Sequence, residues 1–526
     1  MISERLPEMV AESNISIPEH HIGTRIECNE YFGTIKYIGP IEGHPGTWLG
    51  IDWDDLQRGK HNGLVNGIQY FEAKYPKSGS FVRPEKVNFG QTAINSIIAR
   101  YRSENDSLAK IYEEELLSFQ KSINAPFLEL VGFDKVADKL SDFESLQIVN
   151  LRLQNVRSPG EPMQLKNLCP SIRELDISKN LLCSWLDIFD ICIQLEQLEW
   201  LNVNENILSL PENYTDYSFP NIKTLICGYM NLKWSDILKL SIVFPNVEEL
   251  RVPYNEITAL SVPLRHNFKK LKTLDLEGNS IGDWSEIMKL SVISNLQQLN
   301  LENIKLKEIL FDENLEVYPN FTKINISNNV IENWRSVGEL NKLPILEELR
   351  LAKNPVLDLE NLATREALIT ARIASLKVLN GRPISSDERR GAEIDYIKKY
   401  GLEWLKCKNT PLERQFVLMH NRYLELIQKY GCPEERELLI QPNILKTALV
   451  SLNLTYNNKT ITKKLPPTIL VQKLIMMVEK LFKLSERPRL KYVSGLRKEI
   501  EIDLDDEMKE IGYYSIQEGD NIIVLT

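Results

Sequence analysis

The sequence predicts a multidomain α+β protein with a small β-barrel, a long repeat solenoid, a helical spacer and a compact C-terminal domain of strands around one helix. Three patterns predict it: a glycine-rich, aromatic stretch near the N-terminus, a leucine pattern that recurs through the middle, and a strand–strand–helix–strand order at the end. The 526 residues suffice for several separate cores. The expected divisions are 20–90 for the barrel, 91–140 for a helical connector, 141–390 for the solenoid with its cap, 391–445 for the spacer and 446–526 for the last domain.

Composition and motif content argue against several classes of function. The formal net charge of −10 disfavours general binding of nucleic acid, which needs a basic surface. No apolar run of 18 or more residues and no N-terminal signal segment occur, so we expect no membrane association and a cytoplasmic location. Seven cysteines without metal-ligand spacing predict reduced thiols and no metal site. The sequence has no P-loop, Gly-x-Ser-x-Gly or His-Glu-x-x-His motif, so we expect neither an enzyme nor a cofactor.

The barrel is predicted from residues 46–87, where short alternating strands flank a loop that has a glycine at each end. Gly59 and Gly63 bracket Lys60, His61 and Asn62. Because glycine lacks a Cβ atom, each end can adopt a positive φ and allow close approach by another chain. We therefore expect the amides of this loop to face outward, toward acceptors.

This stretch resembles the CAP-Gly domain family over about residues 20–90, on the strength of the loop, Trp48, the Tyr70-Phe71 pair and the run 79–83. The loop of that family reads Gly-Lys-Asn-Asp-Gly, whereas this chain has His61 and Asn62 at the two middle positions. CAP-Gly domains bind acidic peptide ends, notably the Glu-Glu-Tyr or Glu-Glu-Phe end of α-tubulin. The resemblance implies a groove for such a peptide formed by Trp48, Gly59, Lys60, His61, Asn62, Gly63, Phe81 and Arg83.

The residue types suit such a ligand. A terminal carboxylate needs N–H donors and a cation, which the loop backbone and Lys60 could supply, and a terminal ring needs an apolar slot such as one between Trp48 and Phe81. The alternative is that the aromatic residues are simply the core of a domain of about 70 residues, which we favour for Phe71. We interpret His61 as a loop contact, without a metal or catalytic role.

The solenoid is predicted from the frame L-x-x-L-x-L-x-x-N-x-L, which recurs between about residues 146 and 381 at a step of mostly 24 to 26 residues. This is the range of leucine-rich repeats, whose units bury their leucines only by stacking on neighbours. We expect each repeat asparagine to donate to turn carbonyls; Met230 and Ile304 replace it in two copies, so those turns should be bonded differently. Residues 376–390 resemble the C-terminal cap of such arrays. The recurring tryptophans are expected to fill the convex core: Trp185, Trp234, Trp284 and Trp334.

The positions between the strand leucines face the concave side and form a large polar surface of mixed charge. Such a surface suits a folded protein partner, although a merely solvated face is a serious alternative for any single residue. The candidate contacts are Glu174, Asp176, Trp200, Glu249, Arg251, Asp275 and Arg350.

The remaining segments predict helices and a final β-rich domain. Residues 92–120 predict a helical connector that covers the start of the solenoid, and residues 393–407 and 412–430 predict the spacer helices, which end at Gly431 and Pro433. Strands are predicted at 448–456, 459–465, 489–493, 499–503 and 521–525, with a helix at 468–484. This order resembles the β-grasp fold of ubiquitin. Since the sequence ends without a Gly-Gly tail, we expect a ubiquitin-like docking module.

A CAP-Gly domain, leucine-rich repeats and a ubiquitin-like terminus in this order resemble the tubulin-specific chaperone E (tubulin folding cofactor E) family over nearly the whole chain. The resemblance implies a non-enzymatic, cytoskeleton-associated protein that binds α-tubulin and, with other tubulin folding cofactors, assembles or dissociates the α/β heterodimer. It implies that the last domain binds a second cofactor, or proteasome or ubiquitin-pathway proteins.

One alternative is a microtubule lattice or plus-end binder, which usually adds coiled coil or basic Ser/Pro-rich segments that this chain lacks. Another is a leucine-rich regulatory subunit of a phosphatase, which would not need the barrel.

Overall fold

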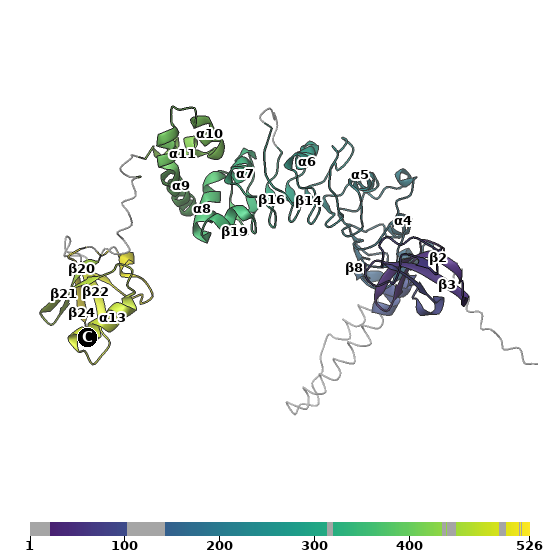
Figure 1. Cartoon of the computed structure of the whole chain (residues 1–526), viewed down its shortest axis with the longest axis horizontal. Coiled ribbons are helices and arrows are strands. Elements are labelled where there is room, and N and C mark those ends of the chain that lie inside the picture. Colours follow the sequence, from purple (N-terminus) through teal and green to yellow (C-terminus); the bar gives the residue numbers. More distant parts are fainter. Residues whose placement is uncertain are drawn as a thin grey trace, which may run out of the picture. The chain divides into compact units, whose positions relative to one another are not determined.

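The computed structural model describes residues 21–101, 143–312, 319–433, 438, 449–493, 501–514, 516 and 518–525. Within these residues, the three larger sheets have four, eleven and five strands (Figure 1). They are built from consecutive parts of the sequence, which confirms the predicted multidomain α+β class. Short 3-10 helices occur at η1 (Pro84–Lys86), η2 (Phe143–Ser145), η3 (Tyr214–Asp216), η4 (Lys289–Val292), η5 (Leu340–Lys342), η6 (Pro355–Leu359) and η8 (Ile511–Tyr514).

The N-terminal sheet is antiparallel, in the order β1-β2-β3-β6, and is curled into a small barrel. Its core consists of the inward-facing residues of consecutive strands, among them Ile26, Ile35 and Ile51. After β6 the chain returns to β1, where Glu27 and Asn88 pair through both backbone amides. The elements are β1 (Arg25–Cys28), β2 (Tyr31–Ile41), β3 (His44–Trp53), the hairpin β4 (Leu64–Val65) and β5 (Ile68–Gln69), and β6 (Gly79–Val82).

The segment after the barrel joins the solenoid directly. Strand β7 (Gln91–Thr92) pairs with β9 (Val156–Ser158) in the first repeat. Residues 93–101 are helical and contribute Ala93, Ile94 and Ile97 to the solenoid core. The predicted helical cover is therefore confirmed for residues 93–101, whereas residues 91–92 form a strand; the rest of the predicted connector lies outside the described residues.

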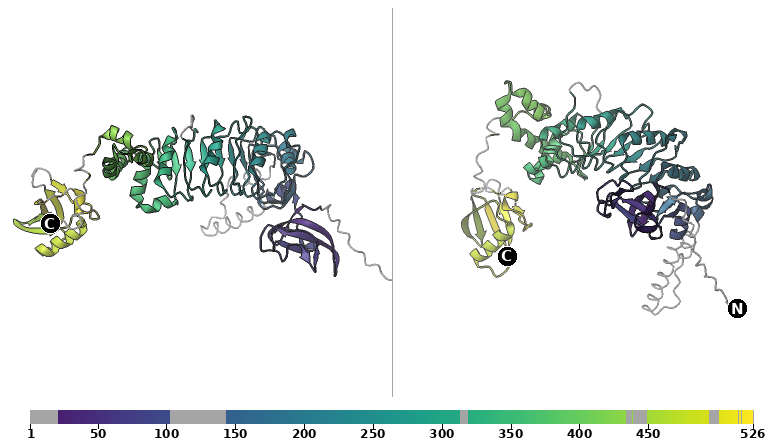
Figure 2. Two further views of the ribbon diagram at one scale, coloured as in Figure 1. Left: turned by 45° about the horizontal axis from the view of Figure 1, so that its top comes forward. Right: turned by 45° about the vertical axis from the view of Figure 1, so that its right-hand side comes forward.

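The middle sheet is parallel along ten of its strands, and corresponding repeat positions lie directly opposite each other (Figure 2). Leu175 faces Leu201 and Leu201 faces Leu225, and the same apolar column continues through the following strands. Only stacking buries these side chains, as the repeat pattern predicts. The strands are β8 (Ile148–Asn150), β10 (Glu174–Asp176), β11 (Trp200–Asn202), β12 (Thr224–Ile226), β13 (Glu249–Arg251), β14 (Thr273–Asp275), β15 (Gln298–Asn300), β16 (Lys323–Asn325), β17 (Glu348–Arg350) and β18 (Val378–Leu379), closed by antiparallel β19 (Arg382–Pro383).

Helices cover the side of the solenoid opposite the strands (Figures 1 and 2). Each recurring tryptophan is the first residue of a helix, and Ser184, Asp283 and Asn333 cap three of these helices through side-chain oxygens. Three of the four tryptophans are at most 4% exposed, so the predicted core role is confirmed for them; Trp334 is partly buried against the same core. The helices are α3 (Gln164–Leu168), α4 (Trp185–Gln194), α5 (Trp234–Val243), α6 (Trp284–Met288), α7 (Trp334–Glu339) and α8 (Leu362–Arg372).

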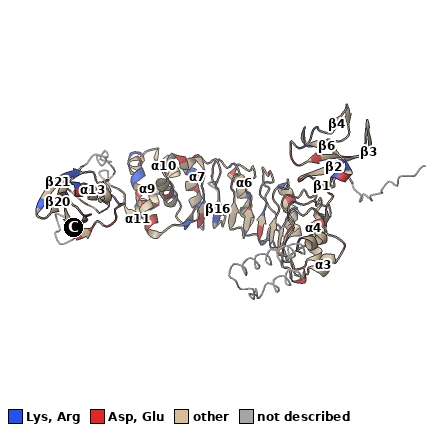
Figure 3. Ribbon diagram, turned by 90° about the horizontal axis from the view of Figure 1, so that it is seen from below, with Lys and Arg blue, Asp and Glu red and all other residues tan. Residues whose placement is uncertain are grey.

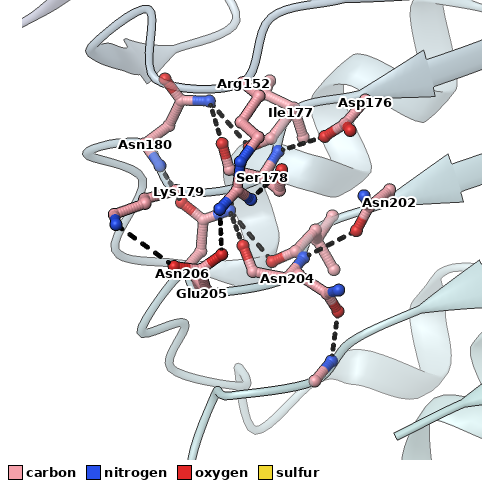
Figure 4. A network of polar contacts seen from close by, with 12 residues as sticks. Arg152, Asp176, Ile177, Ser178, Lys179, Asn180, Asn202, Asn204, Glu205 and Asn206 are labelled. Carbon is pink, nitrogen blue, oxygen red and sulfur yellow. Dashed lines mark hydrogen bonds and ion pairs between the residues drawn. The ribbon is translucent and has the colours of Figure 1, made fainter. Parts of the chain in front are cut away.

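The repeat asparagines form a ladder that ties neighbouring repeats together (Figure 4). Asn180 donates through Nδ2 to the carbonyls of Leu151 (2.9 Å) and Ile177 (2.8 Å). Its Oδ1 accepts from the amide of Val156, and its own amide donates to Oδ1 of Asn206. The predicted bonding is confirmed and recurs at Asn206, Asn255, Asn279, Asn329 and Asn354.

The two repeats without the asparagine lack its side-chain donor, as expected, but keep the backbone bond to the next repeat. The amides of Met230 and Ile304 donate to Oδ1 of the asparagine in the following repeat, at 2.9 and 3.1 Å. Both apolar side chains are buried, at 3% and 0% exposure. The following asparagine thus supplies the acceptor, while the apolar residue adds to the core.

The spacer contains α9 (Ser386–Cys407), α10 (Glu413–Met419) and α11 (Tyr423–Tyr430). The helical pattern predicted over 412–430 is divided between two helices, because the turn between them makes tertiary bonds. Asn421 donates to the carbonyl of Gly338, and Arg422 to that of Ala371.

Burial lowers the pKa of His420 in this turn to about 3, so its imidazole is neutral. Helix α9 runs through residue 390, so the predicted cap and spacer share one helix, and α11 ends at Gly431 as expected.

The C-terminal sheet has the order β21-β20-β24-β22-β23, with β20 parallel to β24. Helix α13 (Val471–Phe482) packs on one side through Val471, Leu474 and Val478. This topology agrees with the predicted ubiquitin-like fold. The strands are β20 (Val450–Tyr456), β21 (Lys459–Leu465), β22 (Arg489–Val493), β23 (Glu501–Asp503) and β24 (Asn521–Leu525), which confirm the predicted strands where they are described; residues 448 and 499–500 of those predictions lie outside the described residues.

We expect Asn279→Ala to destabilise the solenoid by about 3 kcal/mol, because it leaves the buried amides of Asn255 and Ile257 without an acceptor and removes one of the donors to the carbonyls of Val252 and Leu276. Hydrogen–deuterium exchange in the full chain, read over residues 250–280, measures the loss. The control is Asn213→Ala at an exposed asparagine, which should change local stability by at most about 0.5 kcal/mol. Equal effects of both substitutions would contradict the ladder's proposed contribution.

Candidate peptide groove and strand face

A groove of about 350 Å³ opens on the barrel. Strands β2, β3, β4 and β6 and the loop between β3 and β4 contribute its walls. Aromatic and aliphatic residues provide most of its apolar surface, while arginine, lysine and histidine provide its polar groups. The lining residues are Ile41, His44, Trp48, Arg58, Lys60, His61, Val65, Ser80, Phe81 and Val82.

The two loop glycines hold the loop against the barrel. A Cβ on Gly59 would lie 2.5 Å from the backbone of Gly79, and one on Gly63 would lie 1.9 Å from the carbonyl oxygen of Phe71. Gly63 also has φ = +100°, which disfavours any other residue. The close approach at these glycines is therefore to the protein's own backbone.

The expectation that the loop amides face outward is wrong for three of them. The amides of Lys60 and His61 donate to the carbonyl of Gly79, at 2.7 and 3.2 Å, and that of Gly63 donates to Nδ1 of His61. The two bonds to Gly79 anchor the loop to β6, and the third lies within the loop. A short-range pattern of glycines cannot reveal them, because they depend on how the loop folds back onto a strand that lies far away in sequence.

The cations of the groove are not neutralised by carboxylates. Lys60 is exposed, and among the described residues no carboxylate lies within ion-pair distance of Lys60 or Arg58. The Arg58 guanidinium instead lies 4.8 and 5.0 Å from the ring centres of Tyr31 and Trp53. The groove therefore has a positive charge available to an anionic ligand.

Arg83 supports the groove from outside its lining. Its guanidinium lies 3.9 Å from the ring centre of Trp48 and donates to the carbonyls of Pro45 (2.6 Å) and Thr47 (3.2 Å). These contacts fix the indole that lines the groove. The indole Nε1 is buried and has no hydrogen-bond partner in the described part of the chain.

Phe81 lies at the centre of an aromatic cluster, with ring centres 5.4 Å from those of Tyr70 and Phe71 and 5.3 Å from that of His61. Phe71 is 7% exposed, in agreement with the predicted core role, whereas Phe81 is only partly buried and lines the groove. Burial, with a smaller contribution from the charge of Lys60, lowers the pKa of His61. Its imidazole is therefore neutral at neutral pH.

The structure brings together four of the residues that the sequence suggested for the groove: Trp48, Lys60, His61 and Phe81. Gly59, Asn62, Gly63 and Arg83 are adjacent but outside the lining. Sequence reasoning missed Arg58, which directly precedes the loop, and His44, the first residue of β3. The charge of Arg58 next to the glycine loop was an available signal; the position of His44 depends on the pairing of β2 with β3.

The solenoid strands carry the second candidate surface, which we call the strand face: the first and third residues of β10 to β17. Glu174 and Asp176 lie on β10 and Trp200 on β11. A hollow of about 390 Å³ between β13 and β17 brings together Glu249, Arg251, Asp275 and Arg350. Acidic and basic residues both occur along the solenoid strands (Figure 3).

Many charges in this hollow are already paired. Arg251 lies 2.5 Å from Glu249, and Lys323 lies 3.1 Å from Glu348. Burial raises the pKa of Asp275, although the amides of Glu277 and Asn300 donate to its carboxylate. A partner that binds here would therefore have to replace these ion pairs or add further charges to them. The polar surface of a folded protein could do either.

The described residues hold no group of three or more His, Cys, Asp or Glu side chains arranged for a metal ion. None of the described helices is long and apolar enough to cross a bilayer.

Comparisons with known proteins concern the N-terminal domain, the whole chain and the C-terminal domain. The CAP-Gly domain family matches residues 22–87. The chain is 36% identical over 524 residues to tubulin-specific chaperone E of Danio rerio, covering 96% of this chain and 98% of that protein. It is 35% identical over 530 residues to the Xenopus laevis protein of the same name, covering 97% and 99%. The solution structure of the C-terminal ubiquitin-like domain of mouse tubulin-specific chaperone E is 27% identical, with a TM-score of 0.14, covering 14% of this chain and 84% of that one.

We expect Gly63→Ala to unfold the loop, at a cost above about 3 kcal/mol, because the new methyl group meets the Phe71 carbonyl and φ is positive. The matched control is Gly67→Ala, where φ is also positive, at +80°, but nothing lies within 4 Å of a Cβ. This change should cost only about 1 kcal/mol. Hydrogen exchange over residues 46–87 of the full chain distinguishes the two; equal losses would mean that the contact with Phe71 is unimportant.

Proposed function

The chain belongs to the tubulin-specific chaperone E family, and we propose that it is a tubulin folding cofactor that binds α-tubulin and, with other tubulin folding cofactors, assembles or dissociates the α/β heterodimer. Members of this family are chaperones and not enzymes. We further propose a cytoplasmic, cytoskeleton-associated location, as the family name and the CAP-Gly module suggest.

The proposal rests above all on the chemistry of the barrel groove. Lys60 and Arg58 supply positive charge that no described carboxylate neutralises, and Trp48 and Phe81 supply aromatic walls. A flexible acidic peptide with a terminal aromatic residue complements both features. The α-tubulin tail, which ends in Glu-Glu-Tyr or Glu-Glu-Phe in the ligands of CAP-Gly domains, is the occupant that we propose.

We assign the folded body of α-tubulin to the strand face. Its hollow is too polar for a small apolar ligand, and its interspersed charges suit a large polar interface. A tail contact alone is small, with an affinity on the order of micromolar. Two contacts on one chain increase the overall affinity through effective concentration, provided that both can be made at once.

The ubiquitin-like domain would then dock a second cofactor or a protein of the proteasome or ubiquitin pathway.

A microtubule lattice or plus-end binder with the same groove remains the second candidate, because a CAP-Gly module by itself is compatible with it. Size-exclusion chromatography with tubulin dimer and cosedimentation with microtubules distinguish the two. If α-tubulin separates from β-tubulin and elutes in a complex with this chain, the result supports the folding cofactor. If the chain binds only to microtubules, the result supports the lattice or plus-end binder.

Lys60→Ala should weaken binding of an acidic peptide ending in Glu-Glu-Tyr about tenfold, because the terminal carboxylate loses its cation. Calorimetry with the full chain measures the change. Lys77→Ala, at an exposed lysine of the barrel outside the groove lining, is the matched control and should have no effect. The same peptide without its tyrosine should bind poorly to the unmodified chain, and equal binding of both peptides would refute the groove.

The double substitution Arg251→Glu with Arg350→Glu should reduce capture of tubulin dimer more than deletion of the barrel does, because it reverses two charges in the hollow. The matched control is Lys223→Glu with Lys272→Glu, which also breaks two ion pairs, with Glu199 and Glu248, but lies outside the hollow. Surface-plasmon measurements with immobilised dimer compare the three proteins. If deletion of the barrel abolishes capture and the reversal in the hollow has no effect, the solenoid is only a spacer.

A further inference from the structure

One segment on the side of the solenoid opposite the strands exposes aliphatic side chains. Residues 252–272, all of them described, form no helix between β13 and β14, whereas α5 precedes and α6 follows them (Figure 1). Within this segment Val262 and Leu264 are 54% and 63% exposed, and Pro263 between them is buried. Single exposed aliphatic residues are common on protein surfaces, so exposure alone does not indicate a binding site.

The start of this segment is bonded to the helices on both sides. The indole Nε1 of Trp234, the first residue of α5, donates to the carbonyl of Ser261 at 2.9 Å. The carbonyl of Leu260 accepts from Nζ of Lys289 at 2.9 Å, and the amide of Leu260 donates to the carboxylate of Glu286 in α6 at 2.6 Å. These bonds fix the backbone just before the two exposed aliphatic residues.

A buried asparagine fixes the backbone after them. Asn267 is 7% exposed, and its Nδ2 donates to the carbonyl of Leu238 (3.0 Å) and to Oγ of Ser241 (2.6 Å), both in α5. Its Oδ1 accepts from the amide of Leu264 at 2.9 Å, and its own amide donates back to the Leu264 carbonyl at 2.9 Å. The Leu264 side chain is therefore exposed on a fixed turn, and a partner that binds it orders little additional backbone.

The exposed charges around this turn are positive. Residues 257–274 contain no Asp or Glu, and Arg265, Lys269 and Lys270 are exposed. Within the described chain no carboxylate lies within ion-pair distance of Arg265 or Lys269. Lys272, by contrast, is paired with Glu248 at 2.6 Å. In a chain with a net charge of −10, loop 261–270 is thus a local positive surface beside two aliphatic side chains.

This combination determines the chemistry of a matching partner. Carboxylates complement the cations, and an apolar side chain among those carboxylates complements Leu264 and Val262. An anionic lipid surface would also attract the cations, but binding to a bilayer depends on burying a broad apolar face, and only these two aliphatic side chains are exposed in the loop. An acidic protein segment with an apolar residue is therefore the better match.

We propose that loop 261–270 is a docking site for an acidic segment of a partner protein, in which Leu264 and Val262 contact an apolar residue of that segment and Arg265 and Lys269 contact its carboxylates. The loop is bonded to the helices that cover the side opposite the strand face, so both surfaces can be occupied at once. The proposal does not depend on the barrel groove.

The first test uses a fluorescein-labelled peptide of four Glu-Glu-Leu units with a C-terminal amide, which lacks the terminal carboxylate proposed for the barrel groove. Its affinity for the full chain is measured by fluorescence anisotropy. Arg265→Glu with Lys269→Glu should weaken binding at least about tenfold, because two attractive contacts become repulsive. The matched control is Lys305→Glu with Lys307→Glu, at two exposed lysines in a later repeat, which should keep the affinity.

The second test concerns the apolar contact. Leu264→Ser should weaken the same peptide about fivefold, whereas Leu362→Ser, at a leucine of α8 that is 64% exposed, should keep the affinity. A peptide of four Glu-Glu-Ser units should bind the unmodified chain more weakly and should not distinguish it from Leu264→Ser. Hydrogen exchange in the full chain should show protection by the Glu-Glu-Leu peptide over residues 258–272.

Several results would overturn the proposal. Absence of binding, equal affinity of the unmodified chain and the two loop variants, or equal losses in the loop variants and their controls would each do so. If vesicles that contain phosphatidylserine bind through the loop and the peptide does not, the occupant is a lipid surface. If sedimentation shows self-association that Leu264→Ser abolishes, the occupant is a second copy of this chain. Either result would replace the partner proposed here.

Discussion

The solenoid depends on one constraint: polar backbone groups that stacking removes from water must find partners inside the protein. The repeat asparagines meet it because an amide side chain can donate and accept at once. Asn279 bonds two carbonyls and two amides from its own and the preceding repeat. Each asparagine therefore connects two repeats, and the two repeats that lack it still donate an amide to the asparagine of the next. The leucines supply burial, while the asparagines make that burial compatible with a polar backbone.

The same constraint operates at the C-terminal end of the array, where the last repeat has no successor. There Arg422 forms a buried ion pair with Glu393, at 3.1 Å, and donates to the carbonyl of Ala371. Arg389 likewise donates to the carbonyls of Thr370 and Ile373. Guanidinium groups of the helical spacer thus satisfy carbonyls that a further repeat would have covered. The helices after the solenoid are in this respect part of its structure.

The barrel groove differs from these interior networks because its charges are left unpaired. On the solenoid several lysines lie beside carboxylates, as Lys223 does beside Glu199 and Lys272 beside Glu248. Lys60 and Arg58 have no such partner in the described chain, and the Arg58 guanidinium lies over the rings of Tyr31 and Trp53. Exposed cations next to apolar walls complement a ligand that carries negative charge beside an apolar group. Charge in the strand-face hollow, by contrast, is largely paired within the protein.

The sequence by itself determined the order of modules, the phase of the repeats, the role of the asparagines and the strands of the last domain, because each is encoded by periodicity or by one side chain acting near its own position. The domain boundaries remain predictions. Only the tertiary structure decided that the loop amides turn inward onto Gly79, that Arg83 supports Trp48, that His44 joins the groove and that a turn interrupts the helical pattern at His420. These features depend on contacts between residues far apart in the chain, and no local pattern records which distant carbonyl or ring a side chain will meet.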